Sequence, residues 1–282
     1  MIAVVDYQKG NLKSVERGLI AAGGEALITA DTSEIAKADA IVLPGVGAFA
    51  DAAATMCELG QMEAIRDRVR AGVPFLGICL GEHLMFEHGV EGAPEGNPAC
   101  GLGLLPGTVV AMPRCDAQGK AFKVPHVGWN TIETPACGEG AAVPPCGEGG
   151  GNAVLSSGGA GGGAARSSAA KRGLFEHGAF PGSAPQVGSE LAFPDSTPQP
   201  ESNLAFACPL FDGIAPGEYF YFTHSYIAPT GSHTVAETTH STRFTSAVQF
   251  GECAFGVQFH PEKSSDAGAR VLANFVAIAA RG

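Results

Sequence analysis

The stretch VPFLGICLGEHLMF, Val73–Phe86, decides the fold of this chain. It begins with an apolar run, which predicts a buried parallel strand. A helical pattern follows and stops at Gly89, so we expect a helix whose inner face carries Leu80, Leu84 and Met85. Cys79 stands at the turn from the strand to the helix.

Two glycines frame this turn. Gly77 and Gly81 lie two residues before and two residues after Cys79, where a Cβ would crowd a sharp strand-to-helix turn. With Ser in place of Cys, the same geometry is the nucleophile elbow of α/β-hydrolases. The helix N-terminus beside the sulfur favours a thiolate. Most free cysteines are buried and structural; the two glycines favour a nucleophile instead.

Composition excludes several classes of protein. The 282 residues are 45% hydrophobic and 16% charged, and the formal net charge of −11 argues against a nucleic-acid or anionic-membrane surface. The eight cysteines form no CxxC pair and have no regular spacing, so we expect no metal site, no disulfide framework and no cofactor. There is no membrane-spanning run and no signal peptide pattern, which predicts the cytoplasm.

The first part of the chain alternates between strand and helix patterns. Buried strands are expected at Ile2–Val5, Ala26–Thr29 and Ala40–Leu43, and a helix is expected over Leu59–Ala71. This alternation predicts an α/β fold with a mostly parallel, doubly wound sheet and helices on both faces. Ligands of such sheets bind beyond the carboxyl ends of the strands, where Cys79 and the Pro44–Gly47 loop both lie.

The second half is richer in strands. They are predicted at Gly107–Met112, Lys123–Glu133, Tyr219–Ala228, Val235–Thr239 and Ala247–Phe259, before an amphipathic helix over Ser264–Ala280. Residues 136–202 interrupt the pattern with Gly, Ala, Ser and Pro. Such composition buries little apolar area, so we expect a low-complexity, flexible insertion within one domain that spans residues 1–282.

A second candidate group for catalysis is His260-Pro261-Glu262. His260 ends a strand pattern and Glu262 follows two residues later, so an imidazole and a carboxylate can form a base and its orienting partner. Alone, His260 is more typical of a satisfied core or surface histidine, and Glu262 of a charge at a helix start. With Cys79 they are the parts of a thiol hydrolase that forms an acyl-enzyme.

These motifs resemble class I (triad) glutamine amidotransferase domains and, more narrowly, the glutaminase subunits of imidazole glycerol phosphate synthase. The resemblance covers essentially everything outside the insertion and runs in family order. Its motifs are VVDYQKGNLKSV at 4–15, LPGVGAF at 43–49, PFLGICLG at 74–81, GLGLLPG at 101–107, KVPHVGWN at 123–130, YFYFTHSY at 219–226 and GVQFHPEKS at 256–264. The DYQKGN and PHVGWN segments are the specific ones.

The resemblance implies roles for particular residues. Cys79 attacks the carboxamide of glutamine to form a thioester, His260 takes and returns the proton, and Glu262 orients the imidazole. Backbone N–H groups of the Val46-Gly47 loop and of Leu80 form the oxyanion hole. The remaining substrate contacts are expected from His83, Ser225 and Tyr226. For His224–Tyr226, a position at the core edge is the alternative.

The resemblance also implies a partner. Ammonia passes to a (β/α)₈-barrel cyclase, which makes imidazole glycerol phosphate and aminoimidazole carboxamide ribotide in histidine biosynthesis. The chain is too short to add a barrel of about 250 residues, so the partner is expected to be a separate subunit of a heterodimer. Expected interface residues are His126, Trp129, Asn130 and Lys263. The alternatives are closure of a strand pair by the first three and a solvated charge at Lys263.

The chain departs from the family pattern at Glu82-His83, where Met-Gln is usual. Gln helps to hold the substrate in relatives, and a His contact is expected to depend on its protonation state. Other function classes therefore stay open: the glutaminase of a different synthase, a stand-alone γ-glutamyl hydrolase, or a silent binding subunit. The DYQKGN and PHVGWN segments favour the glutaminase subunit of imidazole glycerol phosphate synthase over the other hydrolases.

Overall fold

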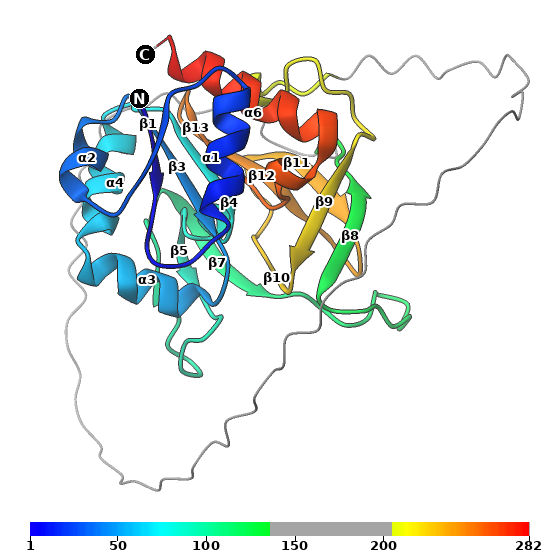
Figure 1. Cartoon of the computed structure of the whole chain (residues 1–282). Helices are drawn as coiled ribbons and strands as arrows, with labels where there is room; N and C mark the ends of the chain where they lie inside the picture. Colours follow the sequence, from blue (N-terminus) through cyan, green and yellow to red (C-terminus); the bar gives the residue numbers. More distant parts are fainter. Residues whose placement is uncertain (136–204, 282) are drawn as a thin grey trace, which may run out of the picture. The chain divides into compact units, whose positions relative to one another are not determined.

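A seven-stranded sheet forms the centre of the molecule (Figure 1). The computed structural model describes residues 1–135 and 205–281; the predicted insertion lies outside them. The strand order is β11-β12-β13-β4-β3-β1-β2, parallel from β13 to β2 and antiparallel at β12 and β11. The strands are β1 (Ile2–Val5), β2 (Ala26–Thr29), β3 (Ala40–Gly45), β4 (Phe75–Cys79), β11 (Thr234–Thr239), β12 (Arg243–Phe250) and β13 (Ala254–Val257).

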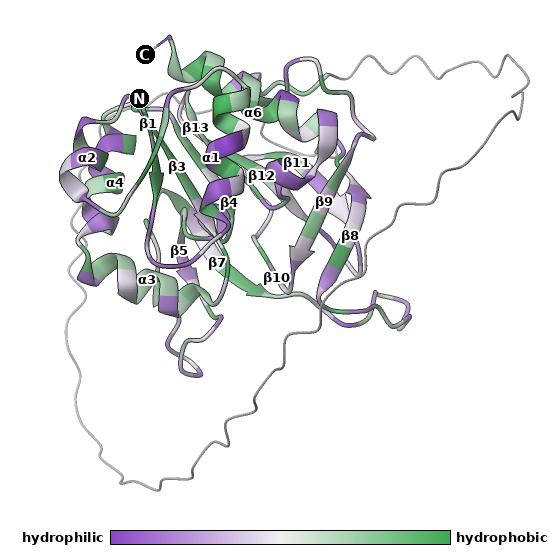
Figure 2. Cartoon of the chain, viewed as in Figure 1, coloured by the Kyte–Doolittle hydropathy of each residue, from purple (hydrophilic) through white to green (hydrophobic). Residues whose placement is uncertain are grey.

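Helices cover both faces of this sheet, which confirms the predicted fold class. Side chains of α1 (Leu12–Ala21) and α6 (Ser265–Ala279) pack in one core cluster with Val4 and Val42. A second cluster joins Ala3 and Val5 to α2 (Thr32–Lys37), α3 (Phe49–Glu58) and α4 (Gln61–Arg70). Alternate residues of β1 thus face opposite cores, and Figure 2 shows β1 and β3 as predominantly hydrophobic strands.

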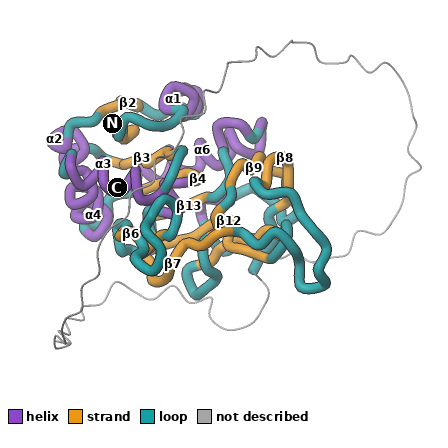
Figure 3. The backbone as a smooth tube through the Cα atoms, turned by 90° about the horizontal axis from the view of Figure 1, so that it is seen from below, coloured by secondary structure: helices purple, strands orange, loops and turns teal. Residues whose placement is uncertain are grey.

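Two smaller sheets accompany the central sheet. One has the order β10-β7-β5-β6, from β5 (Phe86–Gly89), β6 (Ala99–Cys100), β7 (Leu105–Ala111) and β10 (Tyr226–Ile227). The other is a ribbon of β8 (His126–Thr131) and β9 (Tyr219–His224), paired in an antiparallel register. Figure 3 shows this ribbon at one side of the molecule, away from α2 and α4. The short 3₁₀ turns are η1 (Pro209–Phe211) and η2 (Pro261–Lys263).

The helix expected from Cys79 to Gly89 is wrong in length. Only α5 (Leu80–His83) is helical, and Phe86–Gly89 forms β5 instead. The Leu84 carbonyl accepts a hydrogen bond from the Leu102 amide, and β5 pairs with β6 and β7. Partners far along the chain therefore override the local helical spacing.

Other boundaries also differ from the prediction, and two of these differences occur at a glycine. The predicted helix at Leu59–Ala71 is α4, but α3 precedes it and was not predicted; Gly60, with a φ of +71°, separates the two. The predicted strand at Ala247–Phe259 is a hairpin of β12 and β13 that turns at Gly251, with a φ of +59°. Both glycines adopt the left-handed conformation that lets the chain reverse.

Candidate active site

The register of three parallel strands brings the predicted catalytic segments together. β4 lies between β3 and β13, with Cys79 opposite Gly45 on one side and Ile78 opposite Val257 on the other. The carboxyl ends of parallel strands meet at one sheet edge. The Val46-Gly47 loop therefore follows β3 beside Cys79, and the residues leading to His260 follow β13 on the opposite side.

The turn at Cys79 has the predicted steric basis. A Cβ on Gly77 would lie 2.5 Å from the Gly81 carbonyl oxygen, and one on Gly81 would lie 1.8 Å from the Leu43 oxygen. Cys79 itself has a φ of +54° and a ψ of −106°, an unusual conformation for a residue with a side chain. Since α5 has only four residues, the helix dipole supports the thiolate less than the sequence predicted.

His260 and Glu262 form a buried pair. The His260 Nδ1 lies 2.9 Å from Oε1 of Glu262, and the two side chains are 3% and 2% exposed. Burial lowers the pKa of His260, but hydrogen bonding and charge interactions with Cys79 and Glu262 outweigh it and raise the pKa to about 9. Within the described residues the His260 Nε2 has no hydrogen-bond partner at ordinary distance. It is thus available to exchange a proton at the site.

A cavity of about 410 Å³ lies in front of Cys79 and His260. This volume suits a small-molecule substrate. All six residues predicted to contact substrate or form the oxyanion hole line it: Val46, Gly47, Leu80, His83, Ser225 and Tyr226. His224, which the resemblance places with Ser225 and Tyr226 beside the substrate, also lines the cavity. Sequence reasoning had not selected the other lining residues as contacts: Ala48, Glu91, Pro125 and Thr223.

His83, which stands where the family usually has Gln, is buried close to the nucleophile. His83 is 3% exposed, and its Nε2 lies 2.7 Å from the Gln258 Oε1. The Gln258 amide in turn donates a hydrogen bond to the Cys79 sulfur at 3.7 Å. Sequence reasoning missed Gln258; the available signal was its place in the GVQFHPEKS motif, two residues before His260.

Burial shifts the pKa of both substituted residues toward their neutral forms. It lowers the pKa of His83 to about 4, despite the hydrogen bond to Gln258, so the ring is neutral near pH 7. This shift argues against the expected pH dependence around the ordinary imidazole pKa, which stays a prediction. Glu82 is fully buried, and neither carboxyl oxygen has a partner in the described ranges. Burial, followed by the nearby Cys79, raises its pKa well above the usual value.

The residues predicted to contact a partner lie on or behind the β8–β9 ribbon. Trp129 is 51% exposed, and the exposed Lys263 places its Nζ 6.0 Å from the centre of the Tyr221 ring. His126 is buried and its Nδ1 lies 3.0 Å from the His224 Nε2. Asn130 donates to the Thr239 carbonyl at 3.0 Å. Trp129 and Lys263 thus present their side chains to solvent, while His126 contacts the pocket residue His224.

The described residues contain neither a candidate metal site nor a candidate membrane span. No cluster of three or more His, Cys, Asp or Glu side chains in these ranges could hold a metal ion. Over the same residues, every helix is too short or too polar to cross a membrane.

Comparison with known proteins identifies the class. The family model described as glutamine amidotransferase class-I matches residues 3–135 and 188–279. The chain belongs to this family, and it is therefore a glutamine amidotransferase. Solved structures agree on the fold: a glutamine amidotransferase crystal structure superimposes with a TM-score of 0.56 at 15% identity, covering 99% of this chain and 100% of that one.

Sequence relatives narrow the class. The imidazole glycerol phosphate synthase subunit HisH of Moorella thermoacetica is 35% identical over 276 residues, covering 97% of this chain and 93% of the relative. HisH of Aromatoleum aromaticum is 33% identical over 285 residues, covering 99% and 98%. These relatives support the prediction of a glutaminase subunit of imidazole glycerol phosphate synthase.

Proposed function

We propose that this chain hydrolyses glutamine to glutamate and ammonia and delivers the ammonia to a separate cyclase subunit of imidazole glycerol phosphate synthase. The observation that carries the proposal is the shared cavity of Cys79 and His260, with Glu262 paired to the imidazole. A nucleophile, a base and an orienting carboxylate are the requirements of covalent amide hydrolysis.

The chemistry has two halves. The Cys79 thiolate attacks the carboxamide carbon of glutamine, and the raised pKa of His260 keeps a proton on the imidazole for the departing ammonia. A thioester remains on Cys79. His260 then takes a proton from water, which attacks the thioester and releases glutamate and the thiolate.

The negative oxygen formed in each half needs hydrogen-bond donors. The Val46-Gly47 loop and Leu80 line the cavity beside Cys79, and their backbone N–H groups are the proposed oxyanion hole. One such donor contributes about 3 kcal/mol to transition-state stabilisation. Ser225, Tyr226 and His83 complete the proposed substrate contacts.

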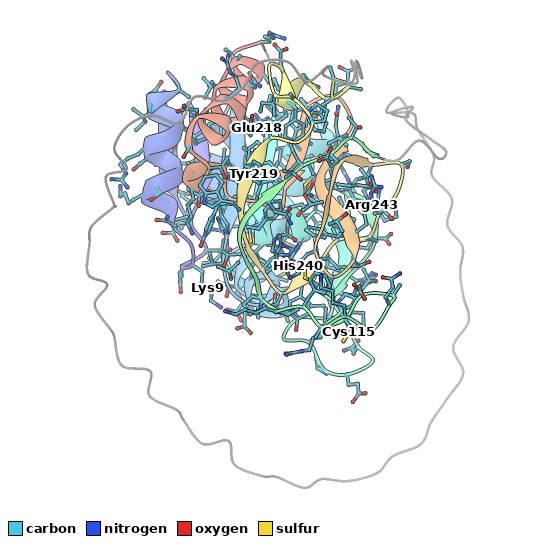
Figure 4. All side chains as sticks on the ribbon, turned by 90° about the vertical axis from the view of Figure 1, so that its right-hand side faces the viewer. Lys9, Cys115, Glu218, Tyr219, His240 and Arg243 are labelled. Carbon is cyan, nitrogen blue, oxygen red and sulfur yellow. The ribbon has the colours of Figure 1, made fainter. Side chains whose placement is uncertain are left out.

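The partner is proposed to bind the β8–β9 ribbon. Val127, Trp129 and Tyr219 are each more than half exposed there, although they are large and apolar. Figure 4 looks onto this side of the molecule, with Tyr219 labelled. An exposed aromatic group of this kind is typical of a protein interface, and Lys263 lies beside it over Tyr221.

Replacing Cys79 with Ala tests the division of labour. We expect the complex of this chain with the cyclase to lose glutamine-dependent synthesis and to keep synthesis from added ammonium, because Cys79 is needed only to liberate ammonia. Cys57→Ala is the matched control, since Cys57 is an exposed free cysteine. Loss of the ammonium-dependent reaction in an assembled complex would contradict the proposal.

A separate measurement addresses the alternative functions. Glutaminase activity is assayed with and without the cyclase and its nucleotide substrate. We expect the cyclase to increase the glutaminase activity of this chain. A stand-alone γ-glutamyl hydrolase would have the same activity with and without the cyclase. A silent binding subunit would release no ammonia from the complex.

A further inference from the structure

We propose that Gln258 stabilises the Cys79 thiolate through its side-chain amide, and that His83 holds this amide in the orientation that points its N–H at the sulfur. The inference deepens the proposed glutaminase function, because it assigns a task to the substituted His83. Gln258 touches the reacting atom, and His83 is a positioning residue that acts through it.

The contacts define a hydrogen-bonded chain. Gln258 Nε2 donates to the Cys79 sulfur at 3.7 Å, and Gln258 Oε1 lies 2.7 Å from His83 Nε2. A carboxamide oxygen can only accept a hydrogen bond, so His83 Nε2 carries the proton. The reversed carboxamide would place its oxygen against the thiolate, bringing two acceptors together. Only one orientation therefore satisfies all three groups when Cys79 is ionised.

Burial makes this arrangement rigid. Gln258 is completely buried, and its backbone amide donates to the Ser246 carbonyl at 3.0 Å, which extends the β12–β13 pairing. His83 has its pKa lowered to about 4 by burial, so its ring carries a single proton at neutral pH. A buried donor aimed at an anion stabilises the ionised form.

The other titratable groups around Cys79 do not supply this donor. Burial is the main cause that raises the pKa of both Glu82 on α5 and Tyr7 beyond β1, so both side chains stay protonated. Within the described residues neither of them makes a hydrogen bond to the sulfur. His224, after Thr223 on β9, has its pKa lowered by burial. His260 is the positive group, held by Glu262. Gln258 is thus a neutral donor whose effect adds to that of the imidazolium.

The contact matters at two points of the proposed reaction. Cys79 carries negative charge before it attacks and again when it leaves the thioester. In the thioester the sulfur is uncharged, so the Gln258 contact weakens there. Gln258 therefore favours the resting thiolate and its departure in the second half of the reaction.

The pH profile of Cys79 alkylation tests this directly. The full chain is treated with iodoacetamide from pH 5 to 10, and the Cys79 peptide is followed by mass spectrometry, which separates it from the other cysteines. Gln258→Met removes the donor at similar length. We expect the midpoint of its profile to rise by about 1 pH unit and alkylation below the midpoint to slow about tenfold.

Two His83 variants separate positioning from packing. His83→Phe keeps a ring without nitrogen atoms and is expected to move the midpoint upward in the same direction. His83→Gln can still donate to Gln258 Oε1 and is expected to keep the midpoint close to wild type. A loosened pocket would instead speed alkylation at every pH without moving the midpoint.

Each outcome bears on the proposal. Superimposable profiles for wild type and Gln258→Met would overturn it. If Gln258→Met does not fold, equal midpoints for His83→Phe and His83→Gln would overturn it, and an upward shift in His83→Phe alone would support it. Alkylation requires neither glutamine nor the cyclase. A wild-type chain without glutaminase activity would therefore refute the proposed function, while the alkylation profiles could still be compared.

Discussion

Two histidines close to Cys79 are almost equally buried, and yet their pKa values shift in opposite directions. His260 is 2% exposed and has its pKa raised to about 9, whereas His83 is 3% exposed and has its pKa lowered to about 4. Burial favours the neutral ring in both. The difference lies in the partners: His260 meets the Glu262 carboxylate and Cys79, and His83 meets the neutral carboxamide of Gln258.

The two carboxyl groups of the site differ in the same way. Glu262 has an imidazole at 2.9 Å. Glu82, directly behind the nucleophile, has no partner in the described part of the chain and its pKa is raised by burial. The His260–Glu262 pair is therefore built for charge, whereas His83, Gln258 and Glu82 favour neutral groups. The following changes break or sharpen that contrast.

Glu262→Gln should have the largest effect, because it removes the charge that distinguishes the His260–Glu262 pair. Loss of a positioned acid–base pair is expected to lower kcat for glutamine by about 10²- to 10⁴-fold. The stabilisation from the raised His260 pKa is fully present below the unfolded pKa near 6.5 and is lost as pH rises through 9. It is on the order of 3 kcal/mol, and urea unfolding of the variant should show less of this pH dependence.

Glu252→Gln is the control for this change, since Glu252 is exposed. Unchanged kcat in Glu262→Gln would remove the basis for assigning His260 a carboxylate partner in catalysis.

Glu82→Met should have an intermediate effect, of the opposite sign. It replaces a buried carboxyl without a partner in the described residues by an apolar side chain. We expect the free energy of unfolding to rise by about 1–3 kcal/mol. The unfolded carboxyl ionises above its usual pKa while the folded one stays protonated. The gain should therefore be smallest near pH 4 and grow as pH rises toward the folded pKa.

Urea unfolding at several pH values measures this gain, with Glu95→Met at an exposed position as the control. A less stable variant, or a gain that does not change with pH, would show that Glu82 is satisfied in the folded protein.

His83→Gln should have the smallest effect. A flexible carboxamide can contact both Gln258 and bound glutamine, so we expect KM for glutamine to fall by about fivefold, corresponding to about 1 kcal/mol. Because the pKa of His83 is about 4, the ratio of the two KM values should stay constant from pH 6 to 9. A ratio that changes near pH 6.5 would mean that the His83 ring is ionised within that range.

The sequence was sufficient for the turn around the nucleophile and for the class of the central sheet. Gly77 and Gly81 around Cys79 predicted a turn whose steric need is visible in the structure, and strand–helix alternation predicted the doubly wound sheet. Local spacing failed at Phe86–Gly89, where pairing with β6 and β7 converts the expected helix into β5. Pairing partners that lie elsewhere in the chain decide such a segment.

The sequence by itself determined which residues could form the candidate site: a cysteine in a glycine-framed turn, and a histidine and a carboxylate after a strand. Only the tertiary structure decided their charge states and the role of Gln258. His83 and Gln258 are 175 positions apart, and the parallel register of β4 and β13 brings together the segments that follow these two strands. A pKa depends on burial and on such distant partners, which no local pattern of residues contains.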